Sequence, residues 1–143
     1  MLFREAKSKD IPQMHAVRMS VNENKLSDPD LIKPADYQRR LEECGKGWVC
    51  EIDDTIVGFA IVDLEEAKVW ALFMHPEHEG QFIGRMLHDM MVTWCFSRAM
   101  PKLTLTTAPN TRAEKFYNKA GWVNTGETAN GEIIFELENN LEI

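Results

Sequence analysis

The N-terminal part of the chain predicts a short strand followed by two helices. Residues 2–6 alternate apolar and polar side chains, as expected of a strand. Ser8 then stands as a helix N-cap, Pro34 begins a second helix that ends at Gly45, and the polar residues 20–33 between the helices predict a loop. One face of the first helix carries residues at helical spacing: Ile11, Met14, Val17 and Arg18.

The middle of the chain predicts three consecutive antiparallel strands. Residues 47–62 have the pattern of a β-hairpin with Asp53 and Asp54 in its turn. A charged turn at residues 64–67 leads into a further strand, Lys68–Met74, with apolar side chains on both faces. Apolar residues on both faces favour a central position in the sheet for this last strand.

The junction after that strand carries most of the candidate chemistry. His75 and Pro76 end the strand, a short loop containing Gly80 and Gly84 follows, and a helix begins directly after the loop. The helix has a core-facing stripe at helical spacing: Ile83, Leu87, Met90, Met91 and Trp94. Such a junction directs unpaired backbone N–H groups and the positive end of a helix at one point, which suits a phosphate.

The C-terminal part predicts a strand, a helix and a final hairpin. Residues 102–107 alternate as a strand, and Thr111-x-x-Glu114 has the form of a capping box. The helix that it begins is expected to end at Gly121 in a left-handed cap. Strands at residues 122–125 and 132–137 flank Asn130-Gly131, a strong hairpin signal.

These elements together predict a mixed α+β fold. About seven mostly antiparallel strands and about four helices follow in the order βααβββαβαββ, and residues 1–143 form one domain. The helix after Gly84 is the only long crossover between strands.

Composition narrows the function classes. The net charge of −7 argues against nonspecific binding to nucleic acid and is compatible with a cationic substrate. No apolar run approaches the roughly 20 residues that span a bilayer, and the N-terminus lacks the apolar core of a signal peptide, so we expect a cytoplasmic protein. The three cysteines show no Cys-x-x-Cys spacing and the histidines are scattered, so no metal site is expected.

Two segments, together with the element order, resemble the GNAT superfamily of N-acetyltransferases. The first is Glu79-Gly80-Gln81-Phe82-Ile83-Gly84, which corresponds to the family's acyl-CoA loop pattern Gln/Arg-x-x-Gly-x-Gly/Ala. The second is residues 110–122, which look like the family's Asn-x-x-Ala-x-x-Phe-Tyr-x-x-x-Gly-Phe segment. The resemblance covers nearly the whole chain apart from residues 20–33 and the C-terminal tail.

The resemblance implies a sheet that splays between its fourth and fifth strands, with acetyl-CoA in the gap. Main-chain groups of Phe73 and Met74 would bind the pantetheine, and Asn110 would bind the cofactor beyond it. The implied pyrophosphate-binding residues are Gln81, Phe82, Ile83, Gly84 and Arg85. Two residues depart from the pattern: Glu79 replaces Gln or Arg, and Phe82 replaces a glycine, which would be strained if its φ were positive. A carboxylate about 4 Å from a phosphate charge would cost about 4 kcal/mol at an effective dielectric constant near 20.

The implied reaction is transfer of the acetyl group to a primary amine of a small molecule or peptide. By the resemblance, Tyr117 matches the family's general-acid tyrosine. A tyrosine suits this role because it is protonated at pH 7 and can reprotonate a thiolate. The base stays open among several titratable residues: His75, His78, Glu51, Asp63, Glu65 and Glu127. The alternatives are a non-catalytic acyl-CoA-binding or sensing domain and a structural interaction module. Family members often pair, so a homodimer is also expected.

Overall fold

Residues 1–140 are described by the structure, a computed structural model. They form seven strands in a single sheet and four α-helices, confirming the predicted α+β class and element order. The strands are β1 (Leu2–Glu5), β2 (Gly45–Ile52), β3 (Thr55–Asp63), β4 (Lys68–Met74), β5 (Lys102–Thr107), β6 (Val123–Glu127) and β7 (Ile133–Glu138). The helices are α1 (Ile11–Ser20), α2 (Pro34–Glu42), α3 (Ile83–Ser97) and α4 (Arg112–Lys119).

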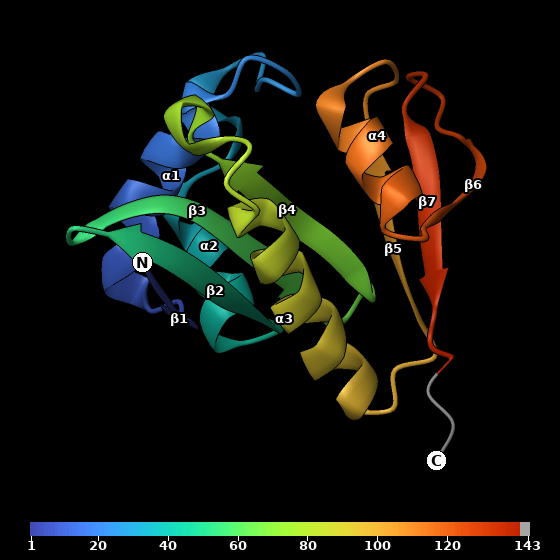
Figure 1. Ribbon diagram of the computed structural model, residues 1–143, viewed down its shortest axis with the longest axis horizontal. Coiled ribbons are helices and arrows are strands. Elements are labelled where there is room, and N and C mark those ends of the chain that lie inside the picture. The colour runs from blue at the N-terminus through green and yellow to red at the C-terminus, as the bar shows by residue number, and fades with distance from the viewer. Residues whose placement is uncertain (141–143) are drawn as a thin grey trace.

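The sheet has the strand order β1-β2-β3-β4-β5-β7-β6, and every neighbouring pair except β4 and β5 is antiparallel. The parallel pair β4 and β5 is matched only at Lys68 and Thr104, supported by a 3.0 Å hydrogen bond from the Thr104 N–H to the Ala67 carbonyl. Beyond this point the two strands diverge, so β1–β4 and β5–β7 form two half-sheets (Figure 1). The predicted splay between the fourth and fifth strands is therefore confirmed.

A separate apolar core lies on each face of the sheet. Helices α1 and α2 cover one face, where Met14, Tyr37 and Phe59 are buried together. Helices α3 and α4 cover the other face, where Leu87 and Tyr117 belong to one cluster. The core therefore places α3 over the first half-sheet and α4 beside the second (Figure 1).

Turn chemistry in the sequence predicts the connections well. Asp53 and Asp54 both adopt positive φ, at 50° and 63°, as the tight turn between β2 and β3 requires. Gly121 has a φ of 94° after α4, so the predicted left-handed cap is confirmed, and the predicted hairpin forms between β6 and β7 with Gly131 in its turn at a φ of 81°.

Some helix and strand ends differ from the prediction. Ser8 does not cap α1: it lies in a 3₁₀ turn, Ser8–Asp10, and the Asp10 carboxylate accepts the Lys7 N–H at 2.8 Å. The Ser8 hydroxyl instead donates to the Glu42 carboxylate of α2 at 2.5 Å, so it does not accept a hydrogen bond from the first turn of α1. Helix α2 ends at Glu42, and Gly45 already pairs with Asp63 as the first residue of β2.

None of the helices among residues 1–140 is long and apolar enough to cross a membrane.

Candidate functional site

A cleft of about 630 Å³ lies where β4 and β5 diverge. Its floor and walls come from the two strands, from α4, from the segment between α1 and α2, and from the β6–β7 turn. The lining residues are Arg18, Asn24–Ser27, Leu31, Val69–Phe73, Leu105–Ala108, Ala113, Tyr117, Asn130 and Glu132. The gap in the sheet is thus an open, mixed polar and apolar site.

The loop between β4 and α3 ends in a left-handed residue that begins the helix. Phe82 is the N-cap of α3 with φ 61° and ψ 10°, and no side chain caps the first helical turn. Gly80, two residues earlier, has φ 80°. The first N–H groups of α3 precede its first internal hydrogen bond, from the Met86 N–H to the Phe82 carbonyl at 3.1 Å. This loop therefore presents backbone donors at the positive end of a 15-residue helix.

Two of the expected cofactor-binding residues, Phe73 and Met74, lie at the end of β4. They pair with Phe59 and Gly58 of β3 on one side, and Phe73 lines the cleft. On the other side the pairing with β5 has already stopped at Lys68. The main chain of β4 near its end is therefore placed to bind an extended ligand as an added strand would.

The other expected residues are distributed around the loop. Ile83 is buried in the core, and Gly84 has no side chain, so only their main chains are suited to ligand contact. Gln81 is exposed. The exposed Arg85 pairs with Asp89 at 3.1 Å, one turn along α3, an exposed contact that a ligand anion can displace because such pairs are worth only about 0.3–0.5 kcal/mol.

Asn110 lies just before α4, and Glu79, which departs from the family pattern, lies in the loop between β4 and α3. Asn110 adopts φ 60°, and its N–H donates to the Glu114 carboxylate at 2.7 Å. Glu79 pairs with Arg112 at the start of α4, with 3.0 Å between Oε2 and Nη1. This ion pair joins the α3 and α4 ends of the site and offsets the negative charge of Glu79 beside the loop.

Tyr117 is a cleft-lining residue on α4 that is only 6% exposed. Its ring contacts Phe116, Trp122 and Phe135, with centroid distances of 5.2, 5.5 and 5.9 Å. Burial raises the pKa of Tyr117 far above its ordinary value, so the phenol is protonated at neutral pH. Tyr117 thus presents a protonated hydroxyl group in a largely apolar wall.

The segment between α1 and α2 closes one side of the cleft. Asn24 donates to the Thr107 hydroxyl at 3.2 Å and accepts the Ala108 N–H at 2.9 Å, both at the end of β5. The Glu23 carboxylate accepts the Arg112 N–H at 3.0 Å. These three hydrogen bonds hold a segment of the first half of the chain against the second half-sheet.

Most base candidates named from the sequence have other partners. Glu51 binds Arg4, Asp63 lies 3.4 Å from Arg40, and Glu65 pairs with Arg39 at 2.7 Å. His75 Nδ1 accepts the N–H of Glu77 in a 3₁₀ turn at 3.2 Å. None of the six candidates is among the described residues that line the cleft, whereas Glu132 of the β6–β7 turn is.

One group has the composition of a metal site. Cys44, Asp63 and Glu65 place their ligand atoms within 4.8 Å of one another, at the end of β3. Asp63 already accepts the N–H groups of Glu65 and Glu66 at 3.0 and 3.1 Å, in addition to its contact with Arg40. Turn capping and ion pairing therefore account for this group.

The structure adds cleft residues that the sequence pattern did not single out as functional: Arg18, Asn24, Lys25 and Glu132. Asn24 and Lys25 lie in the loop of residues 20–33, and Glu132 begins a predicted strand, so no sequence pattern marks these three residues as functional. Arg18 did carry a signal, since it is a cation within the apolar face of α1, where it is only 9% exposed.

Comparison with known proteins gives the same fold and a family match. The Acetyltransferase (GNAT) family model matches residues 11–122. Among solved structures, the ribosomal-protein-S18-alanine N-acetyltransferase from Escherichia coli aligns with a TM-score of 0.80 at 15% identity, over 99% of this chain and 95% of that one. The PaiA N-acetyltransferase from Thermoplasma acidophilum, in complex with coenzyme A, aligns with a TM-score of 0.77 at 14% identity, over 96% and 98%. An N-acetyltransferase from Staphylococcus aureus Mu50 aligns with a TM-score of 0.81 at 14% identity, over 97% and 98%.

Proposed function

This chain belongs to the acetyltransferase (GNAT) family, and from that premise we propose that it transfers the acetyl group of acetyl-CoA to a primary amine of a small molecule or peptide. The observation that supports this most strongly is the cleft between β4 and β5, which is lined by the buried hydroxyl-bearing side chain of Tyr117. A cytoplasmic location and a homodimer stay predictions.

The residues around the cleft fit acetyl-CoA. The first turn of α3, with its uncapped N–H groups, suits the pyrophosphate, and Arg85 and Gln81 are exposed beside it. The unpaired edge of β4 at Phe73 and Met74 suits the amides of the pantetheine arm. In this arrangement the thioester would lie in the cleft near Tyr117, with Asn110 bordering the cofactor on the α4 side.

The proposed chemistry is direct transfer. The acceptor amine is largely protonated at pH 7, and it loses a proton to a base or through water before its lone pair attacks the thioester carbonyl carbon. The new C–N bond forms and the C–S bond breaks, and the nitrogen releases its second proton to the same base or water. The Tyr117 hydroxyl donates its proton to the departing thiolate sulfur and is then reprotonated from solvent. Burial raises the pKa of Tyr117, which makes the phenol a weaker acid. The same burial would raise the pKa of the coenzyme A thiol, which makes the departing thiolate a stronger base, so the two effects offset each other in the proton transfer.

The direct test is the substitution Tyr117→Phe, assayed by release of free thiol from acetyl-CoA with a panel of amines. Because the ring and its packing are kept, we expect kcat to fall about 100-fold or more while the Kd for acetyl-CoA, measured by calorimetry, changes less than about two-fold. Tyr37→Phe is the matched control, since Tyr37 is buried in the core on the other face and does not line the cleft. An unchanged kcat in Tyr117→Phe would remove this tyrosine from the mechanism.

Glu79 and Phe82, the two residues that depart from the family pattern, favour a second candidate function, a non-catalytic acyl-CoA-binding or sensing domain. Phe82 holds a left-handed conformation with its ring 79% exposed at the loop, and Glu79 places a carboxylate there. Acetyl-CoA binding without thiol release with any amine of the panel would favour the sensing domain over the enzyme.

A further inference from the structure

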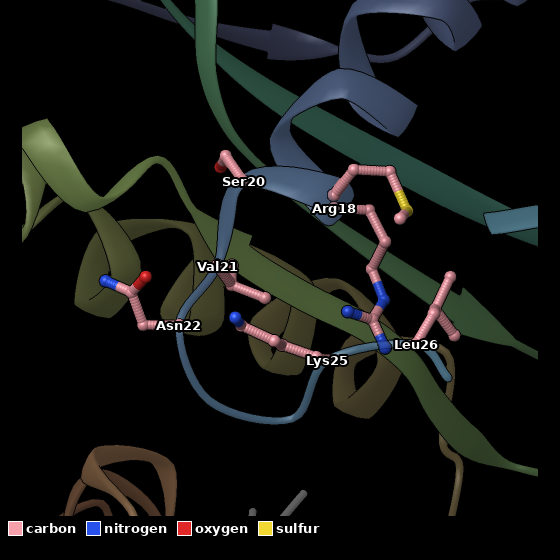
Figure 2. A pocket seen from close by; sticks show the side chains of 7 residues that line it. Arg18, Ser20, Val21, Asn22, Lys25 and Leu26 are labelled. Carbon is pink, nitrogen blue, oxygen red and sulfur yellow. The ribbon is translucent and has the colours of Figure 1, made fainter. Parts of the chain in front are cut away.

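A small side cavity of about 160 Å³ adjoins the main cleft at the end of α1. It is lined by Arg18, Met19, Ser20, Val21, Asn22, Lys25 and Leu26, two of which are cations and none of which is a carboxylate. Figure 2 shows the Arg18 side chain reaching from α1 into the space bounded by this segment, with Lys25 and Leu26 close by. Arg18 and Lys25 also line the main cleft, so the side cavity borders it.

Arg18 is a buried cation that forms no ion pair with any residue among 1–140. It is 9% exposed, and its Nη1 atom has no hydrogen-bond partner among the described residues. The guanidinium group stacks on the Phe73 ring, with 4.0 Å between Cζ and the ring centroid, which orients the group but leaves its N–H donors free for a ligand. Burial lowers the pKa of Arg18, as expected of a cation removed from water without an anion beside it.

The charges on the opposite side of the cleft have the other sign. Glu132 is the one carboxylate among the described cleft-lining residues, and it lies on the β6–β7 turn beside the second half-sheet. Arg18 and Lys25 belong to the first half of the chain. A ligand in the cleft therefore meets positive groups at the α1 end and a negative group at the β6–β7 end.

A planar guanidinium group with free donors matches a carboxylate or a phosphate, and the side cavity has the size for such a group with a few waters. We propose that the acceptor amine carries a carboxylate, which Arg18 binds in the side cavity with Lys25 at its edge. This inference rests on the proposed acetyl transfer and names its substrate class: an amino acid or an amino-acid-like amine. The amine end of such a molecule points away from Arg18, toward the thioester, on the side where Glu132 favours a positive charge. The local charges thus oppose the cationic acceptor that the net charge of −7 suggests.

The test compares acceptors in matched pairs: amino acids with their carboxamides, and phosphoethanolamine with ethanolamine. With the unmodified protein we expect kcat/KM for the acid to exceed that for the amide by about ten-fold or more, since hydrogen bonds to a charged group discriminate by about that factor. Arg18→Met, which keeps an unbranched side chain over Phe73, should lower kcat/KM for the acids about 10- to 100-fold and leave the amides within about two-fold. Arg18→Lys should restore part of the preference.

Arg98→Met is the matched control, because Arg98 also stacks on an aromatic ring, at 4.8 Å from that of Trp94, but does not line the cleft. Its acid-to-amide ratio should equal that of the unmodified protein, and the Kd for acetyl-CoA should be unchanged in all three variants.

Each outcome bears on a different claim. Equal rates for acids and amides, or a preference for polyamines that Arg18→Met strengthens, would overturn the carboxylate acceptor while acetyl transfer stands. An Arg18-dependent preference for phosphoethanolamine alone would overturn the carboxylate in favour of a phosphate. If no amine in the panel causes thiol release from acetyl-CoA, the proposed function and this inference are both overturned.

Discussion

Replacing Phe82 by glycine tests the backbone of the α3 loop directly. Phe82 has a φ of 61°, a left-handed conformation that costs an ordinary L-residue about 1–2 kcal/mol because of its Cβ atom. Glycine avoids this cost but loses about 0.5–1 kcal/mol more than alanine in backbone entropy on folding. The Phe82 ring is 79% exposed, so its removal changes packing little.

The magnitude follows from comparing two variants at the same position. Phe82→Ala keeps the Cβ atom and the strain, whereas Phe82→Gly removes both, so the glycine variant should be the more stable by about 0.5–1 kcal/mol. With an m-value of about 2 kcal/mol per molar urea, the unfolding midpoint of the glycine variant should lie about 0.3–0.5 M above that of the alanine variant. The first-turn N–H groups are unaffected by either change.

The chain offers a control at the other end of the same helix. Ala99 follows the last turn of α3, is exposed, and has a φ of 63°. Ala99→Gly should raise the urea midpoint by a similar amount for the same reason. If Ala99→Gly is stabilising but the two Phe82 variants have the same midpoint, the left-handed conformation at Phe82 is not held in solution. If neither glycine is stabilising, the argument from Cβ strain is wrong.

Two further outcomes follow from contacts near the site. Glu79→Gln should lower the Kd for acetyl-CoA about three- to ten-fold at low salt, measured by calorimetry, because it removes a negative charge at the loop and frees Arg112. Glu77→Gln, at an exposed residue of the preceding turn, is the control and should change the Kd little. Equal effects of the two substitutions would contradict the placement of Glu79. His88→Phe should lower the free energy of unfolding by about 1–3 kcal/mol in urea titrations, because it leaves the buried Trp122 Nε1–H without its acceptor, His88 Nε2 at 2.9 Å. Burial lowers the pKa of His88, so below about pH 6.5 the unfolded chain binds more protons than the folded one, and the free energy of unfolding should fall as the pH decreases. If this dependence of the free energy of unfolding on pH is unchanged in His88→Phe, its assignment to His88 is refuted.

The sequence predicts the fold well because its signals are local. Alternation locates the strands, and the paired aspartates at residues 53–54 and the glycines at 121 and 131 each adopt the positive φ that their turns require. Predicted ends are less accurate where a residue from elsewhere intervenes. The Ser8 hydroxyl, for example, donates to Glu42 of α2 and does not cap α1.

The site is predicted only in part, because the cleft is made by tertiary contacts. The family resemblance identifies the α3 loop and Tyr117 from short motifs. Arg18, Asn24 and Glu132 reach the cleft from segments that are distant in the sequence, and no local pattern encodes their meeting. Similarly, the strain at Phe82 follows from the departure from glycine, but the pairing of Glu79 with Arg112 depends on where α4 packs.

The single matched position between β4 and β5 also bears on how the two half-sheets can move relative to each other. Lys68 and Thr104 lie at the end of β4 that is far from the α3 loop, so the half-sheets are joined at one end and a rotation between them would pivot about this backbone pair. From Lys68 to Met74 the strand is about 20 Å long at about 3.3 Å per residue, so a rotation of about ten degrees about this pair would move the Met74 end by about 3.5 Å. The two hydrogen bonds of Asn24 join the segment between α1 and α2 to the end of β5, away from the Lys68–Thr104 pair, and they would have to break in such a rotation. Such a rotation would also disturb the apolar cluster that α3 and α4 share, including the hydrogen bond from Trp122 to His88, so the buried core resists it together with the polar contacts at the rim.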